Sequence, residues 1–223
     1  ESKIIKALQS HKNIIKIKWY GKINDISSLV TELLSFDLNE ISKRGILSEN
    51  LFKLYGTQMI SAIIHIHSKG YIHRDIKPDN FMIKSNNKRE ICLIDFGLAR
   101  KFVDENNKHV SFENNIELIG SFNYCSRNMH KKIRPSRRDD VESLLYVFLK
   151  MLVQTLPWNN INISKKNEKH EIIYNKKNNI LNYNFNNIND NKSVNNILKM
   201  IKHVQNINYF DKPNYKNLFS IAK

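Results

Sequence analysis

The stretch from Val141 to Leu156 most strongly limits how this chain can fold, because it carries apolar residues on nearly every face of the helix that it would form. A helix that is apolar all round has to be enclosed by other parts of the molecule. A second helical pattern begins after Ser48, a residue type suited to capping a helix, and ends at Gly70. The apolar residues at helical spacing in this second pattern are Leu51, Leu54, Tyr55, Met59, Ile63 and Ile66. We therefore expect a helical body around a buried central helix.

The beginning of the chain predicts a different kind of structure. Ile4, Ile5 and Leu8 are spaced as on one face of a short helix. Residues 13–34 then cluster β-branched and aromatic residues on both sides of a turn at 22–27, which predicts two strands. This part should form a small region rich in β-structure.

The remaining pattern adds short strands and further helices. The segments FMIK and EICLIDF read as strands on either side of the polar turn SNNKR. Helices are expected near 168–176, near 193–205 and after Pro213, with a loose Asn-rich stretch before the second of them. Together these patterns predict an α+β fold that is mostly helical.

Composition narrows the functional classes. The chain has 223 residues, enough for one good-sized domain or for one lobe and part of another. Its net charge of +15 favours acidic or phosphorylated partners, although a bias towards Lys, Asn and Ile explains part of it. No aromatic and basic pattern indicates nucleic-acid binding, and no apolar run reaches the roughly 20 residues of a membrane span. The two cysteines, Cys92 and Cys125, have no metal-type spacing and fit a reducing, intracellular compartment, cytoplasmic or nuclear.

Two polar motifs carry the chemistry. In HRDIKPDNF, Asp75 can orient a hydroxyl and accept its proton, and Lys77 can offset the charge of a moving phosphoryl group. Asn80 and Asp95, the latter in LIDFG, offer the hard oxygen ligands that Mg²⁺ prefers. Gly97 allows the sharp turn after Phe96. Each motif follows an apolar strand, and the two together point to phosphoryl transfer from a nucleotide.

With these motifs the chain resembles the eukaryotic protein kinases and, among them, the casein kinase I family. The Ala-Pro-Glu of most kinases is replaced in that family by a Ser-x-Asn pattern, which is SRN here, Ser126 to Asn128. The resemblance covers nearly the whole chain. It is carried by the segments ESKIIKALQ, HSKGYIHRDIKPDNFMI, IDFGLARKF, SRRDDVESLLYVFL, LPWNN and FDKPNYKNL.

The resemblance implies roles for residues that bind the nucleotide. Glu1 is similar to the helix-C glutamate that pairs with a lysine on the third strand. Thr31 takes the gatekeeper position, and Glu32 to Leu34 form the hinge that bonds adenine through its backbone. Met82 and Ile94 resemble the floor of the adenine pocket. The alternative for such apolar residues is ordinary core packing.

The resemblance also assigns residues of the substrate side. Ser121 keeps the hydroxyl of the family's Gly-Thr-x-Arg-Tyr motif and joins Asp75 and Lys77 in the predicted catalytic set, whereas Asn123 replaces its arginine. Lys169 aligns with a phosphate-binding lysine. Ile5, His73 and Phe96 would stack as the regulatory spine onto Asp140.

The largest departure from the family concerns the front of the kinase domain. Neither a Gly-rich loop nor the strand-three lysine occurs in this chain, which begins at the helix-C glutamate and carries no visible secretory signal. We expect an excerpt of a longer protein in which residues 1–34 are a remnant of the small β-rich N-lobe, with helix C and strands four and five. Residues 35–223 should form the helical C-lobe. Alone, this piece should be inactive.

The resulting prediction is ATP-dependent phosphorylation of protein Ser or Thr residues, with ATP and Mg²⁺ as cofactors. The partners should be protein substrates, acidic or phosphorylated, with no nucleic acid and no membrane, and the full-length protein should be a monomer. The competing interpretation is an inactive kinase-like scaffold that binds protein partners. The intact Asp75, Asn80 and Asp95 favour the enzyme, whereas the missing strands favour the scaffold.

Overall fold

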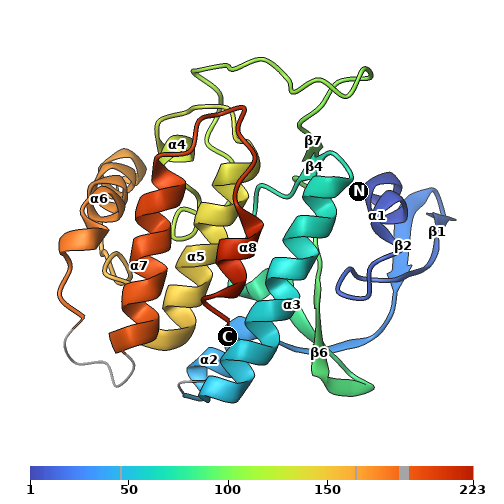
Figure 1. The fold of residues 1–223 in the computed structure, drawn as a ribbon. Helices are drawn as coiled ribbons and strands as arrows, with labels where there is room; N and C mark the ends of the chain where they lie inside the picture. The colour runs from blue at the N-terminus through green and yellow to red at the C-terminus, as the bar shows by residue number, and fades with distance from the viewer. Residues whose placement is uncertain (46, 164, 186–190, 223) are drawn as a thin grey trace.

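The computed structural model describes residues 1–45, 47–163, 165–185 and 191–222 (Figure 1). Part of the predicted Asn-rich stretch, residues 186–190, lies outside the described residues. The helices are α1 (Ser2–Leu8), α2 (Leu38–Lys43), α3 (Glu49–Ser68), α4 (Arg127–His130), α5 (Arg137–Val153), α6 (Lys166–Asn178), α7 (Asn191–Gln205) and α8 (Tyr215–Phe219), with 3₁₀ turns η1 (Pro78–Asn80) and η2 (Ile180–Asn182). The strands are β1 (Ile17–Ile23), β2 (Ile26–Thr31), β3 (Leu34–Asp37), β4 (Tyr71–Ile72), β5 (Phe81–Lys84), β6 (Asn87–Leu93) and β7 (Arg100–Lys101). The predicted α+β class is confirmed.

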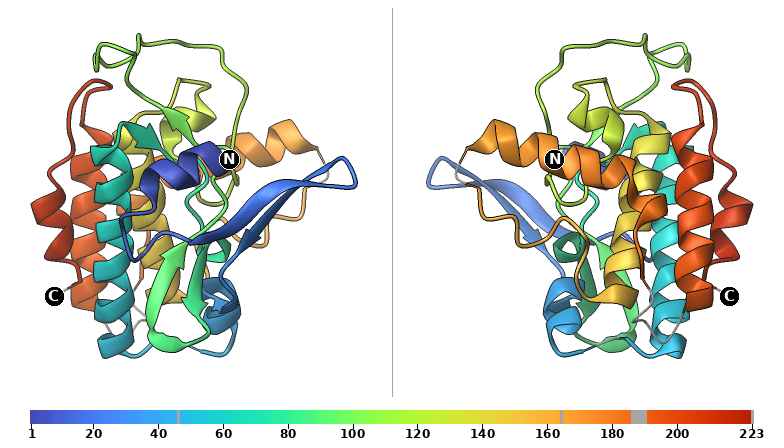
Figure 2. Two further views of the ribbon diagram at one scale, coloured as in Figure 1. Left: turned by 90° about the vertical axis from the view of Figure 1, so that its right-hand side faces the viewer. Right: turned by 90° about the vertical axis from the view of Figure 1, so that its left-hand side faces the viewer.

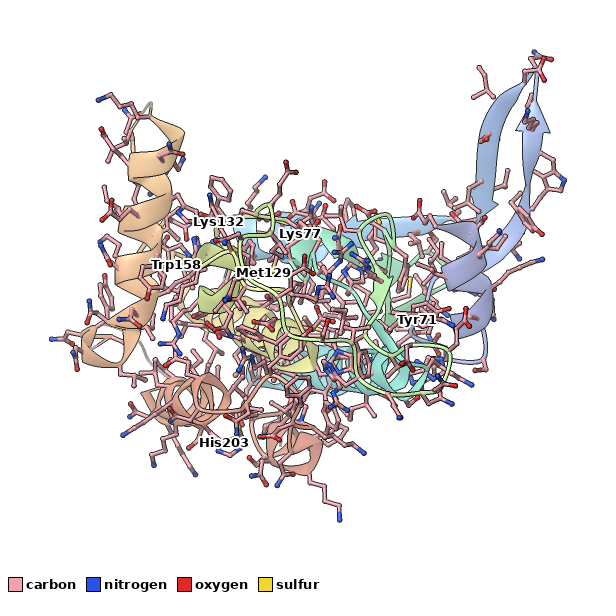
Figure 3. The ribbon with its side chains drawn as sticks, turned by 90° about the horizontal axis from the view of Figure 1, so that it is seen from above. Tyr71, Lys77, Met129, Lys132, Trp158 and His203 are labelled. Atoms are coloured by element: carbon pink, nitrogen blue, oxygen red, sulfur yellow. The ribbon has the colours of Figure 1, made fainter. Side chains whose placement is uncertain are left out.

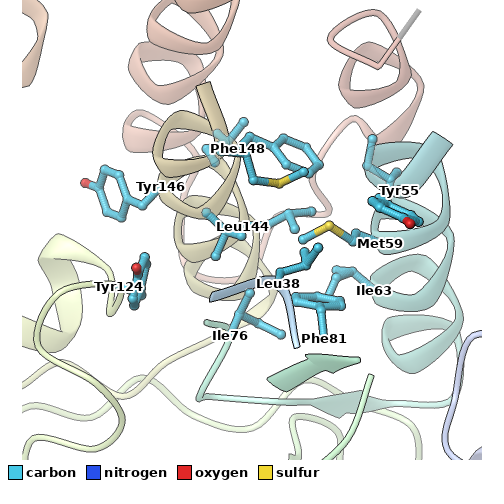
Figure 4. Packing of buried hydrophobic residues seen from close by; sticks show 14 of the residues in the cluster. Leu38, Tyr55, Met59, Ile63, Ile76, Phe81, Tyr124, Leu144, Tyr146 and Phe148 are labelled. Carbon is cyan, nitrogen blue, oxygen red and sulfur yellow. The ribbon is translucent and has the colours of Figure 1, made fainter. Parts of the chain in front are cut away.

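Helix α5 is the predicted central helix. It begins at Arg137, four residues before the apolar run, because the carboxylate of Asp139 accepts a 2.7 Å hydrogen bond from the amide of Ser136 and closes the first turn. Tyr146 and Phe148 are fully buried on different faces of it. Side chains of α3 and β5 pack against it, as Figure 4 shows for Met59 and Phe81. The helical body therefore forms around α5, as its all-round apolar pattern requires.

Helix α3 follows its predicted bounds. The hydroxyl of Ser48 accepts a hydrogen bond of 3.4 Å from the amide of Leu51 and caps the first turn. After the last turn, Gly70 has a φ of +79°, which favours glycine, and a Cβ there would lie 2.8 Å from Val103. Leu51, one of the apolar residues at helical spacing, is exposed.

The described strands form three antiparallel sheets: β3–β5–β6, the pair β1–β2 and the pair β4–β7. Strands β3, β5 and β6 form one sheet against α3, in which Phe81 pairs with Leu93 and Met82 with Cys92. The turn between β5 and β6 is shorter than SNNKR, because Asn87 already pairs with Lys84 across an irregularity in the ladder. The first polar motif ends where β5 begins and the second begins where β6 ends, and the pairing of Phe81 with Leu93 places both at one edge of this sheet.

Strands β1 and β2 form a separate hairpin that extends away from the body (Figures 2 and 3). Its turn, Asn24–Asp25, has φ values of 48° and 61°, as a two-residue hairpin turn requires. The proposed boundary between residues 34 and 35 falls inside β3, after its first residue, and remains a prediction.

Membrane-spanning helices and the two cysteines were also considered in the sequence. None of the described helices has the length and apolarity needed to cross a membrane. Cys92 and Cys125 are both free and buried, in agreement with packing roles.

Candidate active site

The loop after β4 is held from behind by one buried carboxylate. Asp140, in the first turn of α5, accepts hydrogen bonds from the backbone amides of His73 at 2.7 Å and Arg74 at 2.9 Å. His67 Nε2 lies 3.0 Å from the same side chain. Burial alone would raise the pKa of Asp140, but the hydrogen bonds and the neighbouring His67 and His73 outweigh it and lower that pKa. Asp140 is therefore a charged anchor for the loop that carries the HRD motif.

His73 links this loop to the second motif. Its Nδ1 accepts the amide proton of Asp75 at 3.3 Å, so Nε2 carries the proton and donates to the carbonyl of Ile94 at 3.0 Å. Burial lowers the pKa of His73, which keeps the ring neutral. The ring packs edge-on against Phe96 at 5.0 Å between centroids. The two motifs, about twenty residues apart in sequence, are thus joined by a single side chain.

Asp75 lies at the centre of the site and is nearly buried. Its Oδ1 accepts two hydrogen bonds from Ser121, one from the amide at 3.0 Å and one from the hydroxyl at 3.1 Å. Its Oδ2 lies 2.6 Å from Lys77 Nζ and 3.3 Å from the amide nitrogen of Asn80. The structure therefore brings together all three predicted catalytic residues around one carboxylate whose direction is fixed.

The predicted metal ligands Asn80 and Asp95 are also neighbours. The amide of Ile94 donates to the backbone carbonyl of Asn80 at 2.9 Å, which places Asp95 beside the 3₁₀ turn η1. Because the side-chain nitrogen of Asn80 donates to the Asp75 carbonyl at 2.8 Å, its amide oxygen remains the atom that can bind a cation. Asp95 has a φ of 57°, and its carboxylate is exposed.

This donor set fits Mg²⁺ rather than a transition metal. The described residues hold no group of three or more His, Cys, Asp or Glu side chains that could bind a metal ion. Magnesium is usually held by one or two carboxylates, with waters and substrate phosphates completing its octahedron. One carboxylate and one amide oxygen therefore match a cation that arrives with a nucleotide.

The residues predicted to bind the nucleotide lie on several elements. Glu1, which precedes α1, accepts a 3.1 Å hydrogen bond from the amide of Phe96, so the start of the chain is bonded to the second motif. Leu34 and Met82 lie on the paired strands β3 and β5, and Ile94 follows β6. The adenine contacts assigned to these residues remain predictions.

The segment between β2 and β3 has its own hydrogen bonds. The carboxylate of Glu32 accepts a 3.0 Å hydrogen bond from the amide of Lys16, and the hydroxyl of Thr31 donates to the Glu32 carbonyl at 3.3 Å. The Glu32 side chain is thus bonded to the residue that precedes β1. The hydrogen bonds from the backbone of residues 32–34 to adenine remain a prediction.

A cavity of about 420 Å³ opens beside two residues that bond the Asp75 side chain. Lys77, Ser121, Asn123 and Lys169 are among the residues that line it. Lys169 comes from α6, so this helix contributes to the site although it lies at the edge of the molecule (Figure 1). The cavity has the position expected for the residues that surround a phosphate acceptor.

Sequence reasoning missed several residues that hold this region. Lys177 is fully buried beneath the segment that carries Ser121, and Trp158 Nε1 donates to the carbonyl of Asn123 at 2.8 Å. His67 Nδ1 lies 2.8 Å from the hydroxyl of Tyr215, a residue of α8. One signal could have identified Lys177: it lies four residues after the buried Ile173, on the apolar face of α6.

Comparison with known families agrees with this geometry. A family model described as the protein kinase domain matches residues 1–220. The chain therefore belongs to the protein kinase family, and its helical body with small antiparallel sheets is the fold of that family.

Proposed function

We propose that the protein carrying this chain is a serine/threonine protein kinase of the casein kinase I type, with ATP as phosphate donor and Mg²⁺ as metal. The single observation that supports this most is the fixed carboxylate of Asp75, held between Ser121 and Lys77. Phosphoryl transfer needs little covalent chemistry from a protein, so positioning and electrostatics supply most of the catalysis. This site offers both.

The proposed roles follow from the contacts. Asp75 orients the acceptor hydroxyl and takes its proton as the oxygen attacks phosphorus. Lys77, 2.6 Å from Asp75, offsets negative charge on the moving phosphoryl group. Asn80 and Asp95 would hold Mg²⁺, which would offset the negative charge of the phosphates when bound. The proton moves from the acceptor to Asp75 and the phosphoryl group moves from ATP to the acceptor, without a covalent intermediate on the protein.

The test uses the full protein that carries this chain and measures transfer of the γ-phosphate of labelled ATP to serine, threonine and tyrosine peptides in the presence of Mg²⁺. We expect phosphoserine or phosphothreonine, and loss of the signal in an Asp95→Asn variant. Phosphotyrosine alone would contradict the assignment to serine and threonine. Absence of transfer in the wild type would favour the alternative function, a kinase-like scaffold that binds protein partners.

Substrate choice is proposed to depend only weakly on a phosphate already present on the substrate. Casein kinase I enzymes often favour such primed substrates, and the resemblance places Lys169 and residue 123 in the phosphate pocket. Asn123 cannot form the two parallel bonds that arginine makes with phosphate. One hydrogen bond to a charged group contributes roughly 1.5–3 kcal/mol, so primed preference should fall by about ten- to a hundredfold.

Four nearby cations could take the place of that arginine, Arg127, Lys131, Lys132 and Arg134, and the two arginines among them are bonded elsewhere. Arg127 donates to Asn178 at 2.8 Å, and Arg134 pairs with Glu113. Both side chains are thus engaged away from the cavity that Asn123 lines. Matched phosphorylated and unphosphorylated peptides should therefore give similar kcat/KM values, and Asn123→Arg should raise the primed one. A strong primed preference that Asn123→Arg leaves unchanged would show that other residues bind the phosphate.

A further inference from the structure

Lys177 is a buried cation without a role in the proposed chemistry. It lies in the last turn of α6, and its side chain is fully enclosed. Among the described residues it forms no ion pair with a carboxylate: Glu142, the nearest acidic group to influence it, is bonded to Arg127 and Tyr146. Burying a charge is costly unless hydrogen bonds replace the lost water. The ammonium group of Lys177 therefore needs hydrogen-bond acceptors within the protein.

The backbone carbonyls that bind Lys177 belong to one short segment, Ser121–Cys125, which we call the acceptor segment. Lys177 Nζ donates to the carbonyl of Phe122 at 2.7 Å and to that of Cys125 at 2.6 Å. A third partner is His130 Nε2 at 3.1 Å. Burial and the neighbouring Lys177 lower the pKa of His130 to about 2, so this ring is neutral and can accept the hydrogen bond. All three ammonium protons can therefore be used.

Aromatic rings complete the enclosure. The ammonium group lies 5.1 Å from the ring centroid of Tyr146 and 5.4 Å from that of Trp158, within the range of cation–π attraction. Trp158, seen beside α6 in Figure 3, also donates its Nε1 proton to the carbonyl of Asn123. Three carbonyls of the acceptor segment are thus bound from the same side by two side chains.

The other end of the acceptor segment touches the catalytic carboxylate. Ser121 donates both its amide and its hydroxyl to Asp75. Within the segment, the amides of Tyr124 and Cys125 donate to the Ser121 carbonyl at 2.9 Å and 2.8 Å, which closes a tight turn. A displacement at Phe122 or Cys125 would therefore move the groups that hold Asp75.

We propose that Lys177 is a positioning residue for phosphoryl transfer: its ammonium group fixes the acceptor segment, and through Ser121 it sets the direction of Asp75. The proposal rests on the proposed kinase function for its catalytic part. It assigns α6 a task in addition to lining the cavity through Lys169. A helix at the edge of the molecule thereby controls the alignment of the acceptor hydroxyl.

The test compares Lys177→Met with Lys176→Met, since Lys176 is the exposed neighbour on the same helix. Lys177→Met should lower kcat/KM for a peptide by about ten- to a hundredfold, the value of one or more charged hydrogen bonds, and leave KM for ATP unchanged. Lys176→Met should match the wild type. Lys177→Gln, which keeps an N–H donor, should retain more activity than Lys177→Met and serves where the methionine variant fails to fold.

A second measurement does not depend on activity. Hydrogen exchange at the amides of Tyr124 and Cys125 should become faster in Lys177→Met, whereas exchange in α5 should not. In a Trp19→Phe background, the emission of Trp158 should shift when the nearby cation is removed. An active enzyme whose kcat/KM ignores Lys177→Met would overturn the proposal, as would unchanged exchange. A wild type that transfers no phosphate would refute the proposed function alone, because exchange would still decide whether Lys177 holds the segment.

Discussion

The catalytic loop and the β1–β2 hairpin lie in the same small molecule and are held in opposite ways. In the loop, buried polar atoms are paired: Asp140 binds two backbone amides, and Asp75 binds Ser121, Lys77 and Asn80. In the hairpin, large apolar side chains are exposed to solvent, and the two strands are held together by their antiparallel pairing. The exposed apolar residues there are Trp19, Tyr20, Ile23, Ile26 and Val30.

The difference indicates where single substitutions matter. A buried hydrogen-bond network is expensive to break, because each orphaned group loses its partner without regaining water. A two-stranded hairpin is only marginally stable by itself, so substitutions on its surface should change the free energy of unfolding little. We therefore expect large effects in the loop and small effects on stability in the hairpin.

The largest stability effect should come from Asp140→Asn. The new amide group would face the backbone donors of the loop and leave buried N–H groups unpaired, at a cost of roughly 2–5 kcal/mol in the free energy of unfolding. Urea denaturation measures this loss. The control is Asp25→Asn in the hairpin turn, where asparagine tolerates the positive φ of 61° and little change is expected. Equal effects of the two variants would contradict the comparison.

Ser121→Ala should have the next largest effect, this time on catalysis. It removes the hydroxyl bonded to Asp75 and keeps the amide bond. The loss of one hydrogen bond to a charged group, roughly 1.5–3 kcal/mol, predicts a decrease in kcat of about ten- to a hundredfold. Ser121→Thr restores the hydroxyl and should restore most of the rate. A fully active alanine variant would remove Ser121 from the proposed catalytic set.

A smaller effect is expected from the titration of Lys177. Burial lowers its pKa from 10.5 to about 8, so above pH 8 the folded protein binds fewer protons than the unfolded chain. The contribution of Lys177 to stability should therefore rise with pH between about 8 and 10.5. The stability difference between wild type and Lys177→Met should grow by about 1 kcal/mol from about pH 7 to about pH 9.

The groups around Lys177 are Cys125, His130, Glu142 and His170. Because Lys177 lowers the pKa values of Cys125, His130 and His170, the difference between wild type and variant includes their change in titration together with that of Lys177 itself. Chemical denaturation at each pH supplies the values. A stability difference that shrinks as the pH rises would mean that the folded protein favours the ammonium form of Lys177. That result would contradict the predicted increase.

The smallest effect on stability is expected in the hairpin. Ile26, which is 70% exposed, and Val30 can be replaced together by threonine, which keeps β-propensity, with a change in unfolding free energy within about 0.5 kcal/mol. Self-association of a polypeptide of residues 1–223 should nevertheless fall, because exposed apolar surface and strand edges promote association. Light scattering of wild type and variant gives the answer. A monodisperse wild-type monomer would refute this prediction.

The sequence predicted the elements whose own residues determine them. Helix α5 follows from its apolar run, and the end of α3 at Gly70 follows from the need for a positive φ. The turn after β5 was predicted too long, because the pairing of Asn87 with Lys84 depends on the register of the partner strand. Element boundaries set by a neighbour are not visible in a local pattern.

For the candidate site, Asp75, Lys77 and Asn80 lie within six residues and Asp95 lies in a second short motif, so local patterns were enough to select these residues, whose roles stay predictions. Lys177 is one of many lysines in the chain, and its residue type alone predicts an exposed side chain. Its burial depends on Phe122 and Trp158, which come from loops far away in the chain. The contact of His67 with Tyr215 spans 148 positions and has no local signature either.

The proposed function depends above all on Asp75 as the base in phosphoryl transfer. The most direct test compares Asp75→Asn with wild type in the protein that carries this chain, with transfer to a serine peptide and binding of Mg²⁺-ATP measured side by side. We predict that transfer falls by about 10²–10⁴-fold, as for a lost general base, while nucleotide binding stays within about twofold. Unchanged transfer in Asp75→Asn would contradict the account.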